Sequence, residues 1–412
     1  MTVRPLQGIR VTDFSWALAG PYCTMLMALA GAEVIRVETM RRVDFIRFSA
    51  VRRPDTPEGS QPQSSRSVNE SSRFNTVNLN KQGVRLDLNC PEAVELAKAL
   101  VRVSDVVVEN YRPGTMERLG LGYDELRRLH PGVIMIGVSG MGQDGPERSY
   151  TAMAHNFGAL SCMSHLTTYP DGIPTEMRTP MDLLTGTTAY FAVLAALHHR
   201  QVTGEGQYID LAAREAITSF LGDILLDYPM NQESPQPIGN RHSFLAPHGV
   251  YPCKEEDSWI SLAVGTDAEW QALCEVMRRP ELAVDLRFAD GLSRWRHQDE
   301  LDALIGEWTQ GCADLELMHL LQGAGVAAMP SFSSKELIED EHLGKRRVFT
   351  QVTHPELGRQ VVTGPPFRLE ETPMEAYGAA PLMGQHNREV FCGLLGLSEQ
   401  DVERLTRDQV LY

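Results

Sequence analysis

An aspartate near the head of an apolar helix is the feature of this sequence best suited to chemistry. Asp182 follows Pro180, and an apolar run extends from Ala189 to Leu197. Because proline favours a helix start and disfavours helix in the residue before it, we expect a buried helix at 183–199. The free N–H groups and dipole of a helix start stabilise a carboxylate. Asp182 is therefore either an N-cap or a nucleophile that forms acyl intermediates.

Composition and charge limit the classes of function. The chain has 412 residues, of which 42% are hydrophobic and 22% charged, so we expect a globular protein of two domains. A net charge of -16 argues against a nucleic-acid partner and against an anionic membrane surface. The N-terminus lacks an apolar signal core, and no apolar run approaches the roughly 20 residues of a membrane span. We predict a cytoplasmic protein.

The cysteines and histidines do not indicate a metal centre. Seven cysteines are scattered without a C-x-x-C pair, which is typical of reduced thiols. His198 and His199 are adjacent, and neighbours on a helix point about 100° apart. We predict that no metal is bound.

The first half of the chain alternates strand and helix patterns. Strands are expected at 8–14, 32–38, 84–88, 105–109 and 133–139, with helices at 21–29, 91–103 and 122–129. This alternation predicts an α/β fold with a parallel sheet covered by helices, in a large Rossmann-like domain over 1–229. The turn at 15–20 has one glycine where a dinucleotide site needs three, which argues against a dehydrogenase. Glu38 is either a ribose-binding acid or the end of a strand.

The second half has a different pattern. A short strand at 207–211 and a helix at 212–226 lead to the proline-rich segment 229–247, which suggests a linker. A hairpin at 249–264 and helices at 268–277, 298–309 and 315–324 predict a small α+β domain over 230–325. Residues 326–412 are expected to return to the large domain.

Several ordered blocks carry a resemblance to a known family. They are the order Pro, Asp, Thr-Gly, apolar helix, Thr-Gly-x-Gly-Gln, Asp, Glu-Ala at 178–215, together with DFSWALAGP, GAEVIRVE, Val-Glu-Asn-Tyr-x-Pro-Gly at 108–114 and Gly-Gln-x-Gly-Pro at 142–146. This pattern resembles the class III CoA-transferases, which include formyl-CoA and carnitine CoA-transferases. The resemblance implies that Asp182 is the nucleophile, that acyl-CoA and a carboxylic acid are the substrates without a permanently bound cofactor, and that the chain forms an interlocked homodimer.

The resemblance also implies which residues contact CoA. The matching positions are Leu18, Ala19, Thr39, Leu86, Asp87, Leu88, Asn89, Asn110, Tyr111, Arg112, Arg118, Arg148, Ser149, Tyr150 and Thr151. The formyl-CoA branch has glutamine, arginine and glutamate where Leu18, Thr39 and Thr151 stand here, and its glycine-rich lid is missing after residue 230. These departures argue against oxalate and formate as substrates.

Basic and apolar residues extend this prediction. The segment 40–75 resembles a surface loop, and its arginines either form a solvated face or bind CoA phosphates: Arg41, Arg42, Arg47, Arg52 and Arg53. Arg41 or Arg42 is expected to replace the missing arginine at Thr39. A partly apolar acyl pocket is expected from Leu18, Met141, Tyr150, His155, Phe157 and Met163, and it suits succinyl-CoA or a similar donor. His386 is either a hydrogen-bond donor or a structural histidine.

Two other functions remain open, one within the resembled superfamily and one outside it. A 2-methylacyl-CoA racemase needs a base beside the acyl α-carbon, and Ser149 stands where that branch has a histidine. A non-catalytic CoA-binding subunit of a hetero-oligomer is the other alternative, and the presence of Asp182 argues against it.

Overall fold

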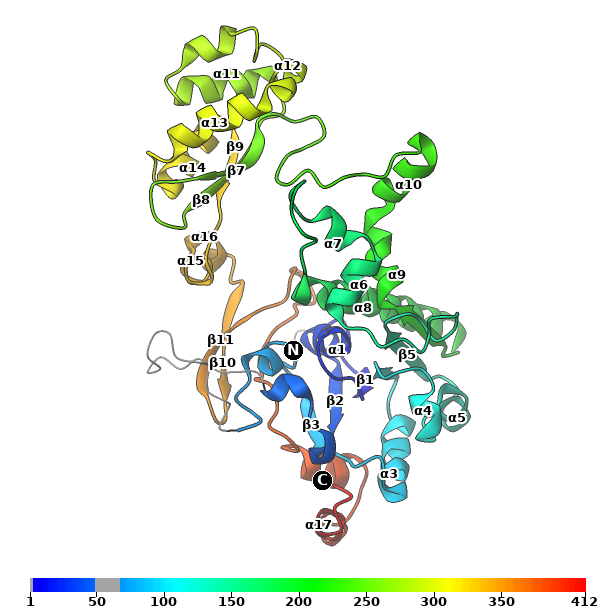
Figure 1. Ribbon diagram of the computed structural model, residues 1–412. Coiled ribbons are helices and arrows are strands. Elements are labelled where there is room, and N and C mark those ends of the chain that lie inside the picture. Colours follow the sequence, from blue (N-terminus) through cyan, green and yellow to red (C-terminus); the bar gives the residue numbers. More distant parts are fainter. Residues whose placement is uncertain (1–2, 49–66) are drawn as a thin grey trace. The chain divides into compact units, whose positions relative to one another are not determined.

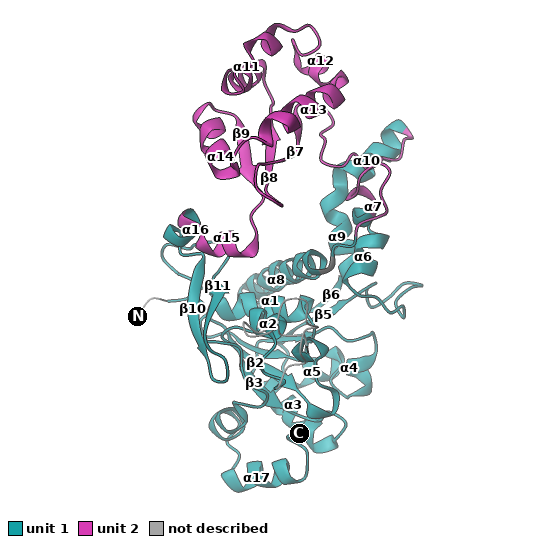
Figure 2. Cartoon of the chain, turned by 60° about the vertical axis from the view of Figure 1, so that its left-hand side comes forward, with its two compact units in different colours: residues 1–164, 176–231, 342–412 teal, residues 165–175, 232–341 magenta. Residues whose placement is uncertain are grey.

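The computed structural model describes residues 3–48 and 67–412, which form two compact units (Figures 1 and 2). The first unit takes in 1–164, 176–231 and 342–412, and the second takes in 165–175 and 232–341. Of the small domain expected at 230–325, residues 232–325 lie within the second unit, which continues to 341. The reason is strand β9 (Ala327–Pro330), which pairs with β8 (Trp259–Ala263) and completes a sheet beyond the last helix of the sequence pattern.

A parallel sheet forms the centre of the first unit. Within the described residues it has six strands, in the order β3-β2-β1-β4-β5-β6, and every neighbouring pair is parallel. Their bounds are β1 Arg10–Asp13, β2 Glu33–Glu38, β3 Gln82–Arg85, β4 Val106–Glu109, β5 Ile134–Ser139 and β6 Tyr208–Ala212. This confirms the expected parallel sheet. The strand order reverses between β1 and β4, and in doubly wound sheets of this order ligands bind at the carboxyl ends of the strands beside that reversal.

Helices cover both faces of the sheet because its strand residues are apolar on both sides. Val106 and Val108 pack with helices α1 (Ala19–Leu29) and α8 (Arg178–Thr203), whereas Val107 packs with α3 (Pro91–Arg102) and α5 (Tyr123–Leu129) on the other face. The remaining elements of this unit are α2 Ser72–Thr76, α4 Thr115–Arg118, α6 Ala154–Leu160, α9 Ala213–Thr218, η3 Ser219–Leu221, α10 Gly222–Asn231, the hairpin β10 Phe349–His354 and β11 Gly358–Thr363, the π-helical turn η5 Glu389–Leu394 and α17 Glu399–Arg407. The boundary between the two units runs through α7 (Met163–Leu166).

The segment expected as a surface loop at 40–75 contributes to the core in its described parts, which corrects that prediction. Two short 3-10 helices, η1 (Met40–Arg42) and η2 (Phe45–Phe48), precede α2, and Ile46, Phe74 and Val77 are buried with Leu18. Arg47 is buried, and its guanidinium donates to both oxygens of Glu38 at 2.9 and 2.7 Å. It therefore belongs neither to a solvated face nor to an open phosphate site. Arg52 and Arg53 lie outside the described residues.

α8 is the central helix of the first unit. Within the described residues it is the one helix long and apolar enough to cross a membrane. Its residues Ala189, Val193 and Ala196 are buried in the core with α1 and the sheet, as in the core helix of a globular protein. The single helix expected at 212–226 is divided in the structure into α9, η3 and α10.

The second unit contains an antiparallel sheet packed with helices. The hairpin of β7 (His248–Pro252) and β8 forms as expected, and β9 adds the third strand of this sheet in the described chain. Its helices are α11 Asp267–Val276, α12 Gly291–Arg296, α13 Gln298–Thr309, α14 Asp314–Gly323 and α15 Ser334–Glu339, and α16 spans Glu341–Lys345. Trp270, Phe288 and Ile305 are completely buried in its core.

Candidate functional site

Asp182 lies inside α8 and does not cap it. The helix begins at Arg178, and its N-cap residue Met177 makes no side-chain hydrogen bond. Pro180 is the third helical residue, a position where its missing N–H has no partner to lose, so the helix begins before the proline and not after it. Asp182 is the fifth residue. The N-cap alternative is therefore wrong.

The carboxylate of Asp182 is largely buried and has no direct partner among the described residues. Burial raises its pKa from 3.8 to about 6, and the charge of Arg73 partly opposes this rise. No described residue donates a hydrogen bond to its side chain or forms an ion pair with it. A desolvated carboxylate without donors remains mostly ionised at neutral pH and keeps its lone pairs free for attack.

Close packing between α8 and α1 fixes the position of Asp182. A Cβ on Gly186 would lie 2.6 Å from the carbonyl oxygen of Ala19 and 3.2 Å from Tyr22, so the helices touch at this glycine. Asp182 precedes Gly186 by one helical turn and shares its face. The carboxylate is thus held beside the N-terminal end of α1, where Leu18 and Ala19 lie.

The loop after β1 is tied to the loop after β4. Asn110 accepts a hydrogen bond from the N–H of Trp16 at 2.9 Å, and its amide donates to the carbonyl of Trp16 at 2.8 Å. Ala17 has a positive φ of 59°, and its N–H donates to Asp44 at 2.9 Å. The structure therefore brings Leu18, Ala19 and Asn110, three of the predicted CoA positions, together where the strand order reverses.

A buried charge network supports this loop, and sequence analysis did not find it. Asp44 also accepts from Arg36 at 2.6 Å, and Asp13 accepts from Lys81 at 3.1 Å. Burial lowers the pKa of Lys81 to about 8, although the charge of Asp13 favours the ammonium form. The only signal in the sequence is the presence of Asp13 and Arg36 within otherwise apolar strands.

The predicted CoA positions after β2 and β3 are close together in the structure. Thr39 caps η1, and Leu86 and Asp87 are buried, whereas Leu88 is half-buried and Asn89 exposed. Arg41 forms an ion pair with Asp87 and lies over the ring of Tyr412. Arg42 stacks on Trp16 at 4.3 Å and has no carboxylate partner among the described residues. Arg42 is consequently the freer of the two cations proposed to replace the arginine at Thr39.

The remaining predicted positions surround a second part of the same edge. Tyr111 is half-buried beside Trp16, and Arg112 is exposed. Arg118 is exposed and donates to Thr115 at 2.9 Å. Arg148 lines a cavity of about 850 Å³ together with Gly114, Glu117, Gln143 and Tyr208, whereas Ser149, Tyr150 and Thr151 are exposed on the chain that follows.

Apolar side chains lie on one side of Asp182. Its neighbour Met181 is completely buried with Phe157, and Met163 packs against the same cluster. Of the other predicted acyl-pocket residues, Leu18 belongs to a different cluster, Tyr150 is 60% exposed, and His155 lies 3.6 Å from Glu176. Of the predicted set, Phe157 and Met163 therefore lie in the apolar cluster with Met181, and Leu18 lies in another one.

His386 is structural. The ring Nδ1 of His386 accepts a hydrogen bond from the backbone N–H of Gly83 at 3.0 Å, and the backbone N–H of His386 donates to the carbonyl of Gly83 at 2.9 Å. Burial lowers the pKa of the His386 side chain. His386 thus pins the C-terminal segment to strand β3. Within the described residues, no three His, Cys, Asp or Glu side chains are grouped to hold a metal ion.

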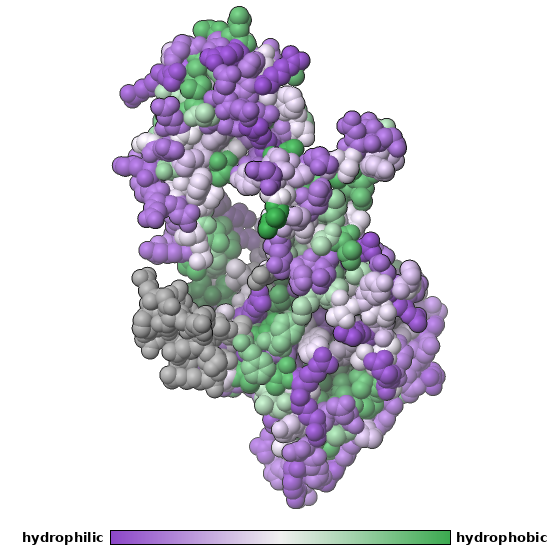
Figure 3. Space-filling model, viewed as in Figure 1, coloured by the Kyte–Doolittle hydropathy of each residue, from purple (hydrophilic) through white to green (hydrophobic). Residues whose placement is uncertain are grey.

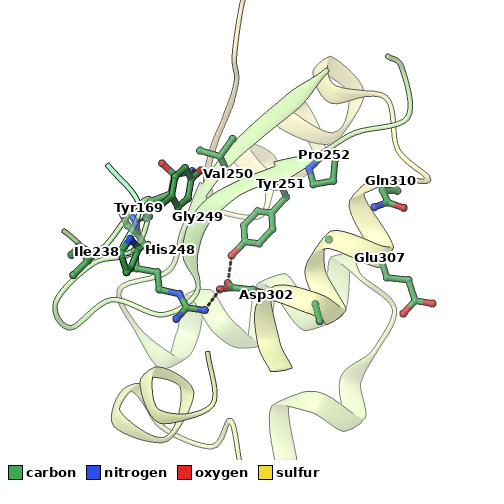
Figure 4. Close-up of a pocket in the computed structure, with 15 residues that line it drawn as sticks. Tyr169, Ile238, His248, Gly249, Val250, Tyr251, Pro252, Asp302, Glu307 and Gln310 are labelled. Carbon is green, nitrogen blue, oxygen red and sulfur yellow. Dashed lines mark hydrogen bonds and ion pairs between the residues drawn. The ribbon is translucent and has the colours of Figure 1, made fainter. Parts of the chain in front are cut away.

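A separate cavity of about 690 Å³ lies within the second unit (Figure 4). Tyr251 donates to Asp302 at 2.8 Å, and Arg241 pairs with the same carboxylate at 3.0 Å. None of the predicted site residues lines it, and its principal charged groups neutralise one another.

The sequence and the fold of this chain match known proteins. Residues 6–387 match the model of CoA-transferase family III. The chain is 36% identical to succinyl-CoA--D-citramalate CoA-transferase of Chloroflexus aurantiacus over 99% of this chain and 98% of that protein. It is 30% identical to the beta subunit of succinyl-CoA--L-malate CoA-transferase of the same organism over 100% of this chain and 99% of that subunit. A crystal structure of a CAIB/BAIF family protein from Brucella suis superimposes with a TM-score of 0.84 at 26% identity, covering 96% of this chain and all of that one.

Proposed function

This chain belongs to CoA-transferase family III and moves CoA from an acyl-CoA to an organic acid, and we propose that it does so through a covalent intermediate on Asp182. The observation that supports this role most directly is the buried carboxylate of Asp182 on α8, which has no partner among the described residues and whose pKa is raised to about 6. The proposed donor is succinyl-CoA, because similar proteins carry succinyl-CoA in their names.

The proposed reaction conserves every group. A carboxylate oxygen of Asp182 attacks the thioester carbonyl and expels CoA thiolate, giving a mixed anhydride. The thiolate attacks the aspartyl carbonyl, which releases the donor acid and leaves an aspartyl-CoA thioester. The acceptor carboxylate then attacks that thioester and forms a second mixed anhydride with loss of CoA thiolate. The thiolate attacks the acceptor's acyl carbonyl, which yields the new acyl-CoA and restores Asp182.

The proposed CoA site follows the carboxyl edge of the sheet. In this site, Leu18, Ala19 and Asn110 lie around the N-terminal end of α1, which packs against α8 at Gly186, one turn from Asp182. Arg42, Arg118 and Arg148 supply exposed guanidinium groups suited to phosphates. CoA acts as a substrate here and is not a resident cofactor.

Trapping tests the covalent step. Protein incubated with succinyl-CoA is treated with hydroxylamine, digested and mapped by mass spectrometry, and the expected product is a hydroxamate at residue 182. Glu256→Gln, which changes an exposed carboxylate in the turn between β7 and β8, serves as the matched control and should leave the adduct unchanged. An adduct on another residue would remove Asp182 from this role. Exchange of an α-proton from heavy water without CoA transfer would favour the racemase alternative.

We also propose that the active form is a cytoplasmic homodimer. α10 has no buried residue, and it exposes Leu225, Leu226, Tyr228 and Met230. Phe191 on α8 is 72% exposed. Apolar side chains gather along α9 and α10 on the face shown in Figure 3. Such a surface fits a second copy of the chain.

Light scattering of the purified chain at micromolar concentration is expected to give twice the monomer mass. A monomeric mass with full transferase activity would contradict the homodimer. A monomer that becomes active only with a second, different chain would instead support a subunit of a hetero-oligomer.

A further inference from the structure

The short helix α2 is held rigidly although it has only five residues. Ser71 caps it by accepting from the N–H of Phe74 at 3.3 Å. The ring of Phe74 is completely buried, and the guanidinium groups of Arg36 and Arg47 lie 5.1 and 3.5 Å from its centroid. Arg73 is the residue before this anchor. Its backbone is therefore fixed, while its side chain is exposed to solvent.

Packing places α2 and Asp182 around the same end of α1. Phe74 is in one apolar cluster with Leu18, and Tyr22 packs against that cluster. Tyr22 also lies beneath Gly186 of α8, one turn beyond Asp182. Arg73 and Asp182 thus approach the first turn of α1 from two different elements. In agreement with this geometry, the charge of Arg73 lowers the pKa of Asp182 and partly opposes the rise caused by burial.

The side chain of Arg73 has no partner within residues 3–48 and 67–412, the part of the chain that the structure describes. Among the described residues none accepts a hydrogen bond from its guanidinium, and it does not contact Asp182 closely enough to form an ion pair. An arginine presents a planar fork of donors that matches a carboxylate, so an unpaired fork near the reacting group is available to a ligand. A donor with a second carboxylate needs such a cation, because Asp182 would otherwise repel it.

We propose that Arg73 binds the remote carboxylate of a dicarboxylic acyl group while Asp182 attacks its thioester carbonyl. This assignment rests on the proposed function and names the residue that selects dicarboxylic over monocarboxylic acyl groups. It divides the site into a cationic end on α2 and a nucleophilic end on α8.

The test compares two esters that differ in the remote carboxylate. Wild type and Arg73→Ala are given succinyl-CoA or butyryl-CoA at pH 8, where Asp182 is ionised, and formation of the hydroxylamine-trapped adduct at residue 182 is measured. We expect Arg73→Ala to raise the KM for succinyl-CoA by about 10-fold or more and to leave butyryl-CoA nearly unchanged. Arg73→Lys, which keeps the charge and loses the fork, should fall between them.

The outcomes separate this role from a structural or general one. Equal losses with both esters, or no loss with either, would overturn the assignment of Arg73. If wild type forms no adduct at residue 182 with either ester, the proposed function itself fails, whatever the variant does. Thermal melting of both variants provides the check on folding, and Arg73→Lys carries the test if Arg73→Ala does not fold.

Discussion

The substitution Asp182→Asn should make the protein more stable and inactive at the same time. The folded state holds the Asp182 pKa at about 6 instead of 3.8, so folding disfavours the ionised form. Two pKa units correspond to about 3 kcal/mol, and solvent reaching this partly exposed group reduces the expected value to about 1–2 kcal/mol. Because the folded pKa is raised, the penalty is absent below pH 3.8, grows between 3.8 and 6, and is complete above 6. The asparagine variant, which carries no charge, escapes it.

Urea unfolding measures this prediction at a fixed protein concentration. At pH 8 the free energy of unfolding of Asp182→Asn should exceed that of wild type by about 1–2 kcal/mol, and at pH 5 by roughly half as much. Glu256→Gln should show no such pH-dependent gain. Transferase activity of Asp182→Asn should fall by several orders of magnitude, since an amide is not a carboxylate nucleophile. Wild-type activity should decline as the pH is lowered through about 6. An asparagine variant that is less stable than wild type at pH 8, or that retains activity, would refute the reasoning.

Three further predictions concern the supports of the site. Arg118→Ala or Arg148→Ala should raise the KM of every acyl-CoA alike with little change in kcat, as expected for uniform binding; a loss in kcat alone would mean a different role. Gly186→Ala should lower the free energy of unfolding by about 1–3 kcal/mol and reduce kcat, because its Cβ meets the backbone of α1; Gly306→Ala, whose Cβ meets nothing within 4 Å, is the control in denaturant unfolding. Asp44→Asn removes a counter-charge of buried Arg36 and should cost about 2–3 kcal/mol by the same measurement, with a raised KM for acyl-CoA; unchanged values would show that the network does not hold the loop.

The central sheet could be predicted from the sequence because its signal is local. Apolar strands such as 32–38 and 133–139 are separated by amphipathic helices, and the parallel order follows from that alternation. The bounds at β3 were less accurate, because the alternation of apolar and charged residues at 84–88 continues after the strand has ended at Arg85. The third strand of the second unit, β9, was not predicted because only its partner β8 distinguishes it from a loop.

The supports of the candidate site could not be predicted because they depend on tertiary pairing. In the sequence, nothing distinguishes Arg47 from the other arginines of its polar segment, and only the fold shows that it pairs with Glu38 in the core. In the sequence, Gly186 is only a residue of low helix propensity, and the structure shows that it allows the backbone of Ala19 to approach α8. Arg73 lies in a helix of five residues, too short to give a periodic signal. The resemblance to a family supplied the positions along the chain, and the structure supplied their contacts.

The position of Asp182 within α8 shows why a carboxylate that caps a helix is a poor nucleophile. An N-cap aspartate accepts hydrogen bonds from the free N–H groups of the first turn, which lowers its pKa and occupies its lone pairs. At Asp182, five residues after the N-cap Met177, the backbone N–H groups are bonded within the helix and are not available to a carboxylate. Asp182 is therefore desolvated without being hydrogen-bonded, and Gly186 brings it against α1. A start of α8 after Pro180 would have placed the same aspartate where the helix itself would have satisfied it.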